Sequence, residues 1–402
     1  MSQDISDFIT PSCDLLAVGE PTHTVPAFGR LRNELFARLA ERGFRSIALE
    51  IDRVAALTAD DYVREGVGDL DTALNEGFSH GWGAKETNRE LLIWMREYNR
   101  NRPPEQRLAL HGFDASTENF NAPSPRRYLE HARDHLGLDL DIAGVAGDDE
   151  RWSRTEAIMD PAMSPGDSPE ARRLRAIAAD LLTALHTHEP QAPSRAEPDA
   201  TSRAEPQATS RAAWLRARTY LMAGLGLLRY HKQAAVPLER NERITRLSAT
   251  RDALMAQNLL DIRTTEAGRG RTLVHAHNAH LQKSITTMSA ADLDLRWIGA
   301  GALAGHLLGD RYAFIAGSLG RSEPIGVTEP EPDTFEGLLQ ARVTTWGFTA
   351  ADLPGTARVR TGTGPQQYGY FPLDAATLDG ADAVLHIADS TLVHPGPKAG
   401  QR

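Results

Sequence analysis

Short apolar runs, each bounded by turn-forming or charged residues, recur along the chain. The runs are continuously apolar rather than alternating with polar residues, which is typical of β-strands covered on both faces of a parallel sheet. The pattern predicts six such strands, at residues 15–18, 46–49, 108–111, 272–275, 312–316 and 383–387.

A strong helix signal separates the first two predicted strands. Thr24 can cap this helix, Pro26 suits its first turn, and Gly43 is a typical residue just past its end. The apolar stripe of the helix consists of Phe28, Leu31, Leu35 and Leu39. Strand, helix and strand together predict a parallel βαβ unit, in which we expect the two strands to be neighbours about 5 Å apart.

The middle of the chain is predicted to be mainly helical. The candidate helices are 86–101, 169–185, 212–230 and 242–262. We therefore expect an α/β fold, a mainly parallel sheet flanked by helices, with a large helical insertion that covers the active-site cleft. The predicted organisation is a single catalytic domain over residues 1–402, with the α/β core at 10–120 and 270–390 and the insertion at 121–268.

A tandem repeat interrupts the predicted insertion. The segment SRAEPDAT begins at Ser194, and SRAEPQAT follows at Ser202. Its composition of Pro, Ala and charged residues cannot bury a core, so we predict a flexible loop over about residues 188–211.

Composition and charge exclude several classes of protein. The formal net charge of −10 argues against a nucleic-acid partner. The N-terminus lacks a basic stretch followed by an apolar core, and the longest apolar run, 221–228, is too short to span a membrane, so we expect a cytoplasmic protein without a membrane partner. The one cysteine, Cys13, excludes an internal disulfide and a multi-cysteine metal site. No glycine-rich phosphate loop is present, and the oligomeric state is left open.

Charged residues gather at the predicted ends of the first two strands. Glu20 and His23 follow the first strand, and Glu50 ends the second, where parallel sheets bind their ligands. Helical spacing places Arg32 on or beside the buried stripe, where its guanidinium needs a carboxylate partner. We expect the arginine to lie over both glutamates, in a charge cluster that tunes a histidine; the alternative is a buried ion network that fixes the helix to the sheet.

Three histidines, His275, His277 and His280, lie within six residues at the end of the fourth predicted strand. They suit proton transfer and oxyanion stabilisation. Imidazoles three positions apart, with Glu20 or Glu50, would also suit zinc, although the HExxH pattern is absent. The remaining alternative is a set of solvated loop histidines.

Further polar residues are candidates for substrate binding. Arg251 and Asn258 interrupt the apolar stripe of one helix and can line the pocket floor or pair within the core. Asp114 follows the third strand, and His80 and Trp82 lie in a glycine-rich turn that can equally be a plain loop. His275 completes this set.

Six motifs in order resemble the erythromycin esterase family. They are GEPTH, the arginine nine residues after its histidine, IALE, HGFD, RDALMAQN and HAHNAH, and the likeness extends from about residue 15 to 387. The resemblance implies an α/β core with a helical insertion over the cleft. It also implies hydrolysis of a cyclic ester, typically the macrolactone of a macrolide, without a serine nucleophile, and the GxSxG motif is indeed absent.

Family roles transfer to this sequence position by position. By resemblance, His23 is the general base, Glu20 and Glu50 are the paired acidic residues, Arg32 is the arginine, and His277 and His280 are the later histidine pair. We expect His23 to activate water without a covalent intermediate, and His277 or His280 to stabilise the oxyanion or protonate the departing alkoxide. No cofactor is expected.

Pro21, His275 and the repeat depart from the family pattern and leave the substrate open, as a hydrophobic lactone or another polyketide or peptide. Three alternatives remain: a lyase or cyclase of natural-product biosynthesis, a metal-dependent hydrolase, and a protein that binds its ligand without reaction. Whether the role is antibiotic resistance, detoxification or biosynthesis is also open.

Overall fold

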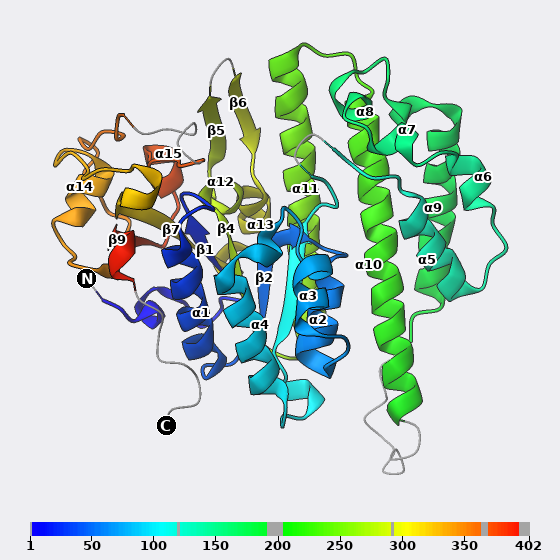
Figure 1. Cartoon of the computed structure of the whole chain (residues 1–402), viewed down its shortest axis with the longest axis horizontal. Coiled ribbons are helices and arrows are strands. Elements are labelled where there is room, and N and C mark those ends of the chain that lie inside the picture. Colours follow the sequence, from blue (N-terminus) through cyan, green and yellow to red (C-terminus); the bar gives the residue numbers. More distant parts are fainter. Residues whose placement is uncertain (1, 119–120, 191–203, 291–292, 363–368, 394–402) are drawn as a thin grey trace. The chain divides into compact units, whose positions relative to one another are not determined.

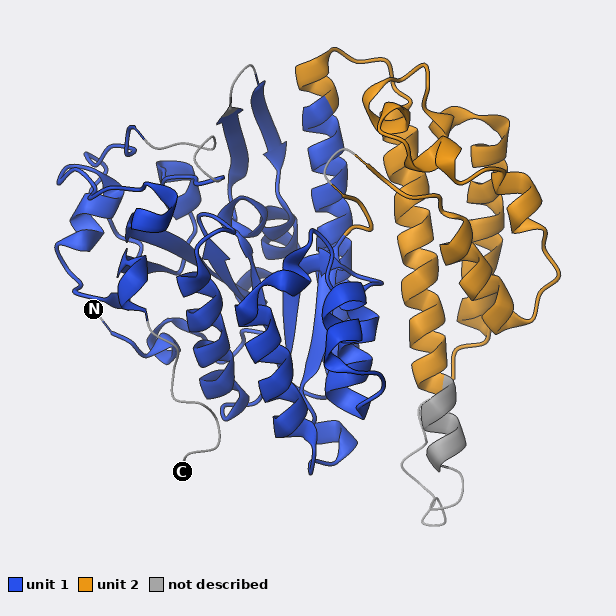
Figure 2. Cartoon of the chain, in the orientation of Figure 1, with its two compact units in different colours: residues 1–114, 244–402 blue, residues 115–243 orange. Residues whose placement is uncertain are grey.

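A computed structural model describes residues 2–118, 121–190, 204–290, 293–362 and 369–393. The chain forms two compact units, one of residues 1–114 and 244–402 and the other of residues 115–243 (Figure 2). In the described part of the chain, no helix is both long enough and apolar enough to cross a membrane.

The first unit is built on a seven-stranded sheet. Six strands are parallel and correspond to the six predicted runs, which confirms the predicted α/β class, and the short β8 at the edge is antiparallel to β9. In spatial order the strands are β3 (Ala109–Asp114), β2 (Phe44–Asp52), β4 (Arg271–His277), β1 (Leu15–Glu20), β7 (Tyr312–Arg321), β9 (Ala383–Asp389) and β8 (Trp346–Thr349).

The strand order corrects one prediction. β1 and β2 are not neighbours, because β4 lies between them and pairs with both. A helical connection constrains the parallel direction of two strands but not how many strands it crosses, and β4 is almost wholly buried, as a central strand should be. The strand that leads into the late histidines therefore lies between the strands that carry Glu20 and Glu50, and His277 is paired in register with Glu20.

Helices cover both faces of the sheet (Figure 1). Alternate strand residues such as Leu16 and Ile47 pack against α1 (Pro26–Ala40), and also on this face are α2 (Ala56–Glu65), α3 (Leu70–Gly77) and α4 (Glu86–Asn99). The intervening residues, such as Ala17 and Val274, pack against α11 (Arg240–Glu266) and α13 (Ala300–Leu308). The continuous apolar runs are thus explained by burial on both faces.

Helix α1 forms where the sequence predicts it, with Pro26 at its first position. Thr24 does not cap it: Val25 is the N-cap residue and makes no side-chain bond, while the Thr24 hydroxyl lies 2.9 Å from that of Thr22. The rest of the first unit consists of a two-stranded antiparallel hairpin and short helices: α12 (Asn278–Leu281), β5 (Ile285–Ala290), β6 (Leu293–Ile298), α14 (Phe335–Gln340) and α15 (Ala375–Leu378).

The second unit is helical, as predicted, around a core that includes Trp152, Leu181 and Leu221. Its helices are α5 (Arg126–Leu136), α6 (Ile142–Ala146), α7 (Glu150–Ser153), α8 (Glu156–Met159), α9 (Pro169–Thr187) and α10 (Ala204–Ala234). This unit ends earlier than the predicted insertion, since from Ile244 onward α11 belongs to the sheet-containing unit and packs on the sheet. That the insertion covers a cleft stays a prediction.

The predicted loop at 188–211 falls partly outside the described residues, which omit 191–203. Its last residues are helical, because α10 begins at Ala204. The second repeat copy runs directly into a stretch rich in Ala, Leu and Arg, which are strong helix formers, and Pro206 is tolerated in a first turn.

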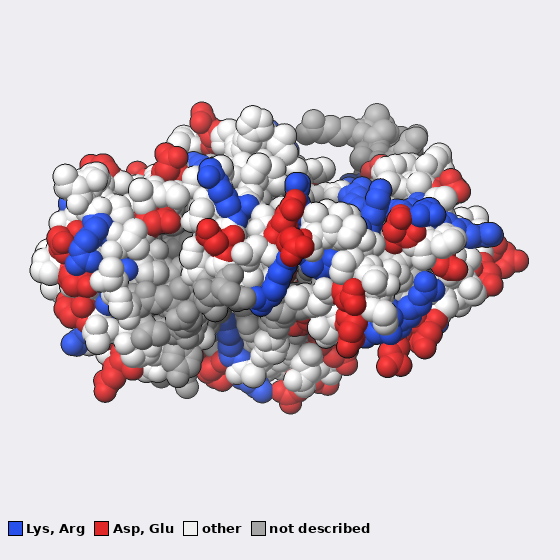
Figure 3. All heavy atoms as spheres, turned by 90° about the horizontal axis from the view of Figure 1, so that it is seen from above, with Lys and Arg blue, Asp and Glu red and all other residues white. Residues whose placement is uncertain are grey.

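Charged side chains are mixed on the face of the molecule shown in Figure 3. Over the described residues of that face, Lys and Arg alternate with Asp and Glu and form no extended basic surface. The absence of a nucleic-acid partner remains a prediction from the net charge.

Candidate active site

The candidate residues meet at the carboxyl ends of β1, β2, β3 and β4, all within the first unit. Glu20 ends β1, Glu50 lies near the end of β2, and Asp114 ends β3. The ring centroids of His23 and His277 are 5.3 Å apart. The predicted convergence of the early and late motifs is therefore confirmed, and β4 produces it by lying between the two glutamate-bearing strands.

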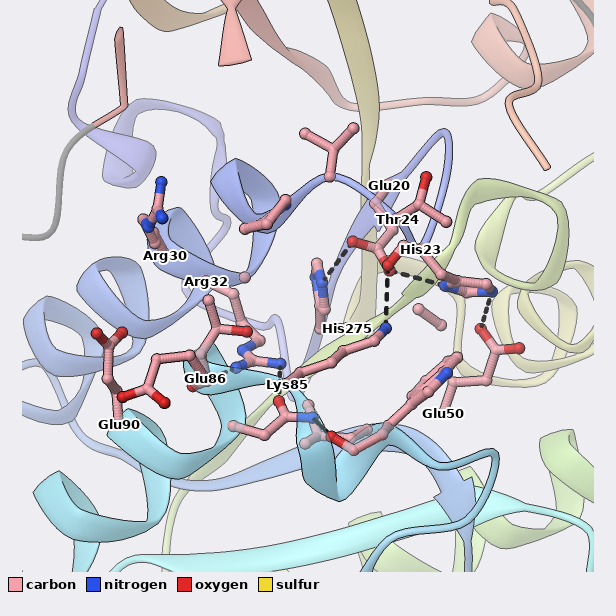
Figure 4. Close-up of a pocket in the computed structure, with 18 residues that line it drawn as sticks. Glu20, His23, Thr24, Arg30, Arg32, Glu50, Lys85, Glu86, Glu90 and His275 are labelled. Atoms are coloured by element: carbon pink, nitrogen blue, oxygen red, sulfur yellow. Dashed lines mark hydrogen bonds and ion pairs between the residues drawn. The ribbon is translucent and has the colours of Figure 1, made fainter. Parts of the chain in front are cut away.

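Glu20, His23 and His275 form one half of the site, here called the Glu20 cluster (Figure 4). His23 Nδ1 donates to Glu20 Oε1 at 2.8 Å, and His275 Nε2 lies 3.3 Å from Glu20 Oε2. His275 Nδ1 donates to the Val18 carbonyl at 3.0 Å. Burial raises the pKa of Glu20, but the nearby imidazoles outweigh it and hold this pKa well below its usual value.

The end of β1 is shaped by a close approach to Asn278. The Asn278 amide donates to the Gly317 carbonyl at 2.8 Å and accepts from the Gly317 N–H at 2.9 Å, which ties the end of β4 to β7 across β1. A Cβ atom on Gly19 would clash with Asn278 Oδ1. Gly19 of GEPTH and Asn278 of HAHNAH thus pack directly against each other, and this contact helps to fix the position of the neighbouring Glu20.

Glu50, Arg251, Asp114, His280 and Asp252 form the other half, the Glu50 cluster. Glu50 Oε1 is 3.2 Å from Arg251 Nη2 and 3.3 Å from His280 Nε2, and its Oε2 accepts from the His277 backbone N–H at 2.9 Å. Burial raises the pKa of Glu50, but His280, His23 and Arg251 together lower it well below its usual value.

Arg251 also binds Asp114 through two bonds. Its Nε donates to Oδ1 at 2.9 Å and its Nη2 to Oδ2 at 2.6 Å, the bidentate geometry that guanidinium and carboxylate prefer. His80 Nε2 lies 3.1 Å from the same Oδ2. Arg251 therefore joins the ends of β2 and β3 through their carboxylates.

The predicted position of Arg32 over the carboxylates is wrong. The guanidinium donates instead to Asn33, to Asn88 and to the Thr87 carbonyl. Among the described residues it has no ion pair, and burial lowers its pKa to about 10. Its helix turns this side chain toward the start of α4, and the arginine that contacts Glu50 is Arg251 instead.

His277 is held as a neutral imidazole. Its Nε2 donates to the Pro21 carbonyl at 3.1 Å, and its Nδ1 accepts from the Ala279 N–H at 3.1 Å. Burial lowers its pKa to about 3. The Phe371 ring packs edge-on against it at 4.7 Å. Both nitrogens are thus used in holding the loops, so His277 is poorly placed to donate a proton.

His280 has the opposite environment, because of a residue that the sequence reasoning missed. Its Nδ1 donates to Asp252 Oδ1 at 2.9 Å. Burial lowers the pKa of His280, but Asp252 and Glu50 outweigh it and raise this pKa above the usual value. Asp252 follows Arg251 in RDALMAQN. An acidic residue next to a polar residue on a buried helix face is the sequence feature that could have indicated Asp252.

Of the remaining predicted residues, Trp82 lines the cavity, whereas Asn258 and His80 support the end of β3. Trp82 lies 4.6 Å from the His23 ring, and Lys85, which was not predicted, sits 3.9 Å over Trp82 and donates to the His23 carbonyl. Asn258 donates to the Phe113 and Asp114 carbonyls and so holds the end of β3. His80 adopts a left-handed φ of 59°, which turns its ring toward Asp114.

A cavity of about 430 Å³ opens beside His23, within the usual size range of small-molecule sites. Among its lining residues are Glu20, His23, Arg32, Glu50, Trp82, Lys85 and His275 (Figure 4). Six predicted residues are not part of its lining: His80, Asp114, Arg251, Asn258, His277 and His280. Within the described residues, no group of three or more His, Cys, Asp or Glu side chains has an arrangement that would hold a metal ion.

Comparisons with known proteins agree on a family and a fold. A family model described as erythromycin esterase matches residues 39–388. No curated protein matches the chain. A solved Bacillus cereus protein is similar, at 16% identity and a TM-score of 0.66 over 96% of this chain and 90% of the other.

Two further solved structures are similar at the level of the fold. A succinoglycan biosynthesis protein has 16% identity and a TM-score of 0.63, covering 96% of this chain and 90% of that one. A mutant of the erythromycin esterase EreC, in its open conformation, has 17% identity and a TM-score of 0.62, covering 94% of this chain and 91% of that one.

Proposed function

Because this chain belongs to the erythromycin esterase family, we propose that it opens a macrolactone or a related cyclic ester by adding one water molecule. Family membership supports an esterase-like hydrolase acting on a small molecule. The lactone substrate and the mechanism below are our proposals, as are a cytoplasmic location and a role in antibiotic resistance or natural-product biosynthesis.

The hydrogen bond from His23 to Glu20 carries the proposal. A carboxylate only accepts, so the 2.8 Å contact fixes the ring proton on Nδ1 and leaves the Nε2 lone pair free to act as a base. His23 is also accessible, with its side chain 30% exposed, and it lines the cavity. An oriented imidazole of this kind is the arrangement that general-base catalysis needs.

Water activation follows from this geometry. His23 Nε2 lies 3.7 Å from Glu50 Oε2, so a water molecule can donate one hydrogen bond to each acceptor. His23 takes a proton from that water, and the oxygen attacks the ester carbonyl to give a tetrahedral intermediate. The carbon–oxygen bond of the ester then breaks, its electron pair leaves on the alkoxide, and the proton that His23 took from water is returned to that alkoxide, so that the net change is the addition of one water.

A panel of macrolides and other lactones, incubated with the protein and analysed by mass spectrometry, tests the reaction class. We expect a product heavier than its substrate by one water. Loss of mass or an isomer of unchanged mass would instead identify a lyase or cyclase. Tight binding without any product would identify a binding protein, and inhibition by a chelator that zinc reverses would identify a metal-dependent hydrolase.

The substitution His23→Asn tests the base. We expect kcat to fall by about 10²–10⁴-fold, because this is the usual contribution of a general base. His306→Asn, at an exposed position on α13, is the matched control and should retain full activity. Urea unfolding of both variants should resemble that of the unchanged chain, and a His23→Asn variant with normal turnover would refute the assignment.

A further inference from the structure

Lys85 places an ammonium group in the cavity beside the proposed base. It is the N-cap residue of α4, but its side chain makes no capping bond to that helix. Its Nζ donates instead to the His23 carbonyl at 3.0 Å (Figure 4). Lys85 and His23 both line the cavity. The ammonium is therefore held directly on the residue that carries the base.

Trp82 contacts both the ammonium and the base. Lys85 Nζ lies 3.9 Å from the centroid of the indole ring, well within the distance of about 6 Å at which cations bind aromatic faces. The centroid of the His23 ring lies 4.6 Å from the same indole. Asn88 fixes the turn that carries Trp82, since its amide donates to the Trp82 carbonyl at 3.0 Å. One supported ring thus sets the positions of both groups.

The charge of Lys85 has no ion-pair partner among the residues that the structure describes. In that part of the chain its one hydrogen bond goes to a neutral oxygen, the His23 carbonyl, and an ammonium has three N–H donors. Burial lowers the pKa of Lys85, and the charges of Glu20 and Glu50 offset this only in part. An oxygen that becomes negative in the cavity would therefore find both a cation and N–H donors at Lys85.

The other candidate donors are less suitable. His277 and His280, which the family resemblance suggests for oxyanion stabilisation, do not line the cavity. Arg32 does line it, but its guanidinium donates to Asn33, to Asn88 and to a backbone carbonyl. Among the described lining residues, Lys85 is the cation that contacts the residue of the base.

We propose that Lys85 binds the ester carbonyl oxygen and stabilises the oxyanion of the tetrahedral intermediate. The inference rests on the proposed hydrolysis and assigns a role that it leaves open. As the water oxygen bonds to the carbonyl carbon, the π electron pair of the carbonyl moves onto its oxygen, which accepts N–H bonds from Lys85. When the ester carbon–oxygen bond breaks, this pair re-forms the carbonyl. Lys85 keeps its proton throughout.

Steady-state kinetics on the lactone that the unchanged protein hydrolyses fastest test the role. Lys85→Met should lower kcat about 10²–10³-fold, the usual effect of removing one oxyanion donor. KM should change less than about threefold, because the contact becomes strong only in the transition state. Lys232→Met, at an exposed position on α10, is the matched control and should retain full activity. Normal turnover in Lys85→Met would overturn the inference.

Two further variants separate oxyanion stabilisation from a merely structural bond to the His23 carbonyl. Lys85→Arg keeps the cation, whereas Lys85→Gln keeps an N–H donor without the charge. We expect Lys85→Arg to retain more of kcat than Lys85→Gln does. If Lys85→Gln retains as much or more, Lys85 only ties the start of α4 to the His23 loop. If Lys85→Met does not fold, these two variants still decide the outcome.

A cyclic phosphonate ester with the ring size of the hydrolysed lactone provides a second readout, because its negative oxygen on a tetrahedral centre imitates the oxyanion. Calorimetric titration should show binding to Lys85→Met about 10²-fold weaker than to the unchanged protein, and equal affinities would overturn the inference even if kcat falls. Absence of any hydrolysis product from the unchanged protein would refute the proposed function and this role with it. Hydrolysis that does not depend on Lys85 would overturn this role alone.

Discussion

The two glutamates of the site are buried to a similar degree but are compensated differently. Glu20 is 7% exposed, and its two oxygens are contacted by the imidazoles of His23 and His275. Glu50 is 3% exposed and has a guanidinium, a backbone N–H and the His280 ring. An imidazole gains and loses its proton near neutral pH in most proteins, whereas a guanidinium does not. We expect proton transfer to begin at the Glu20 cluster, where the His23 side chain is accessible, whereas Arg251 gives the Glu50 cluster one cation whose charge does not change near neutral pH.

Substituting the two carboxylates tests this division most strongly. Glu50→Gln should lower the free energy of unfolding by about 3–5 kcal/mol, because it leaves buried cations without their partner. Glu20→Gln should be milder in stability but should lower kcat about 10²-fold, since the amide oxygen still accepts from His23 Nδ1 but no longer carries the negative charge that stabilises the ring once it has taken a proton. Urea unfolding and steady-state kinetics measure both effects. A Glu20→Gln variant that loses more stability than Glu50→Gln would reverse the comparison.

The positions of the strands could be predicted from sequence, because a strand that is buried on both faces appears as a continuous apolar run. The position of α1 could be predicted from its apolar stripe and its terminal residues. The order of the strands could not. Nothing local in residues 272–275 indicates that their strand inserts between β1 and β2, since strand order is decided by packing across the whole sheet.

The errors in the site concern contacts between different elements of the fold, which the local sequence does not specify. Helical spacing correctly indicated that Arg32 is buried, yet its partners depend on which element α1 faces, and these are the residues at the start of α4. The sequence predicted that Arg251 lines the pocket but not that it binds the carboxylates, because it lies about 200 residues from Glu50 in the chain. Asp252 was missed for the same reason: its donors come from three elements that follow it in the chain.

The two arginines offer the next test of the comparison. Arg251→Lys replaces a bidentate contact to Asp114 by a single charge and should cost about 1–3 kcal/mol of stability together with about tenfold in kcat. Arg32→Lys removes bonds to neutral oxygens only, so its effect should fall on stability and leave kcat within about threefold. A larger loss of kcat in Arg32→Lys would restore the role first predicted for Arg32.

The pH dependence of stability should distinguish the two late histidines. The folded pKa of His277 is lowered to about 3, so its contribution is present above the unfolded pKa of about 6.5 and is lost as the pH falls from there toward 3, by up to about 1.4 kcal/mol per pH unit. The folded pKa of His280 is raised, so its contribution is present below about 6.5 and is lost as the pH rises through the folded value.

Urea unfolding between pH 5 and 9 measures these slopes. The slope of the unfolding free energy against pH reports how many more protons one state binds than the other. His277→Gln should reduce this slope on the acid side by the equivalent of about one proton, and His280→Gln should reduce the slope on the alkaline side. The slopes, rather than the absolute stabilities, are compared, because both substitutions also remove contacts. A His280→Gln variant whose slope changes only below pH 6 would mean that His280 is neutral in the folded protein.

The smallest effect is expected at His275, the histidine that departs from the family pattern. His275→Asn can keep the bond from the Nδ1 position to the Val18 carbonyl but loses the contact to Glu20, whereas His275→Gln can place an N–H near Glu20 and loses the bond to Val18. If the contact to Glu20 matters, kcat should fall less than about tenfold in the Asn variant and less still in the Gln variant. Stability should change by about 1 kcal/mol in each, as expected for one hydrogen bond. Equal kcat values in the two variants would show that His275 supports the strand pair alone, and that His23 is the only imidazole of the Glu20 cluster on which turnover depends.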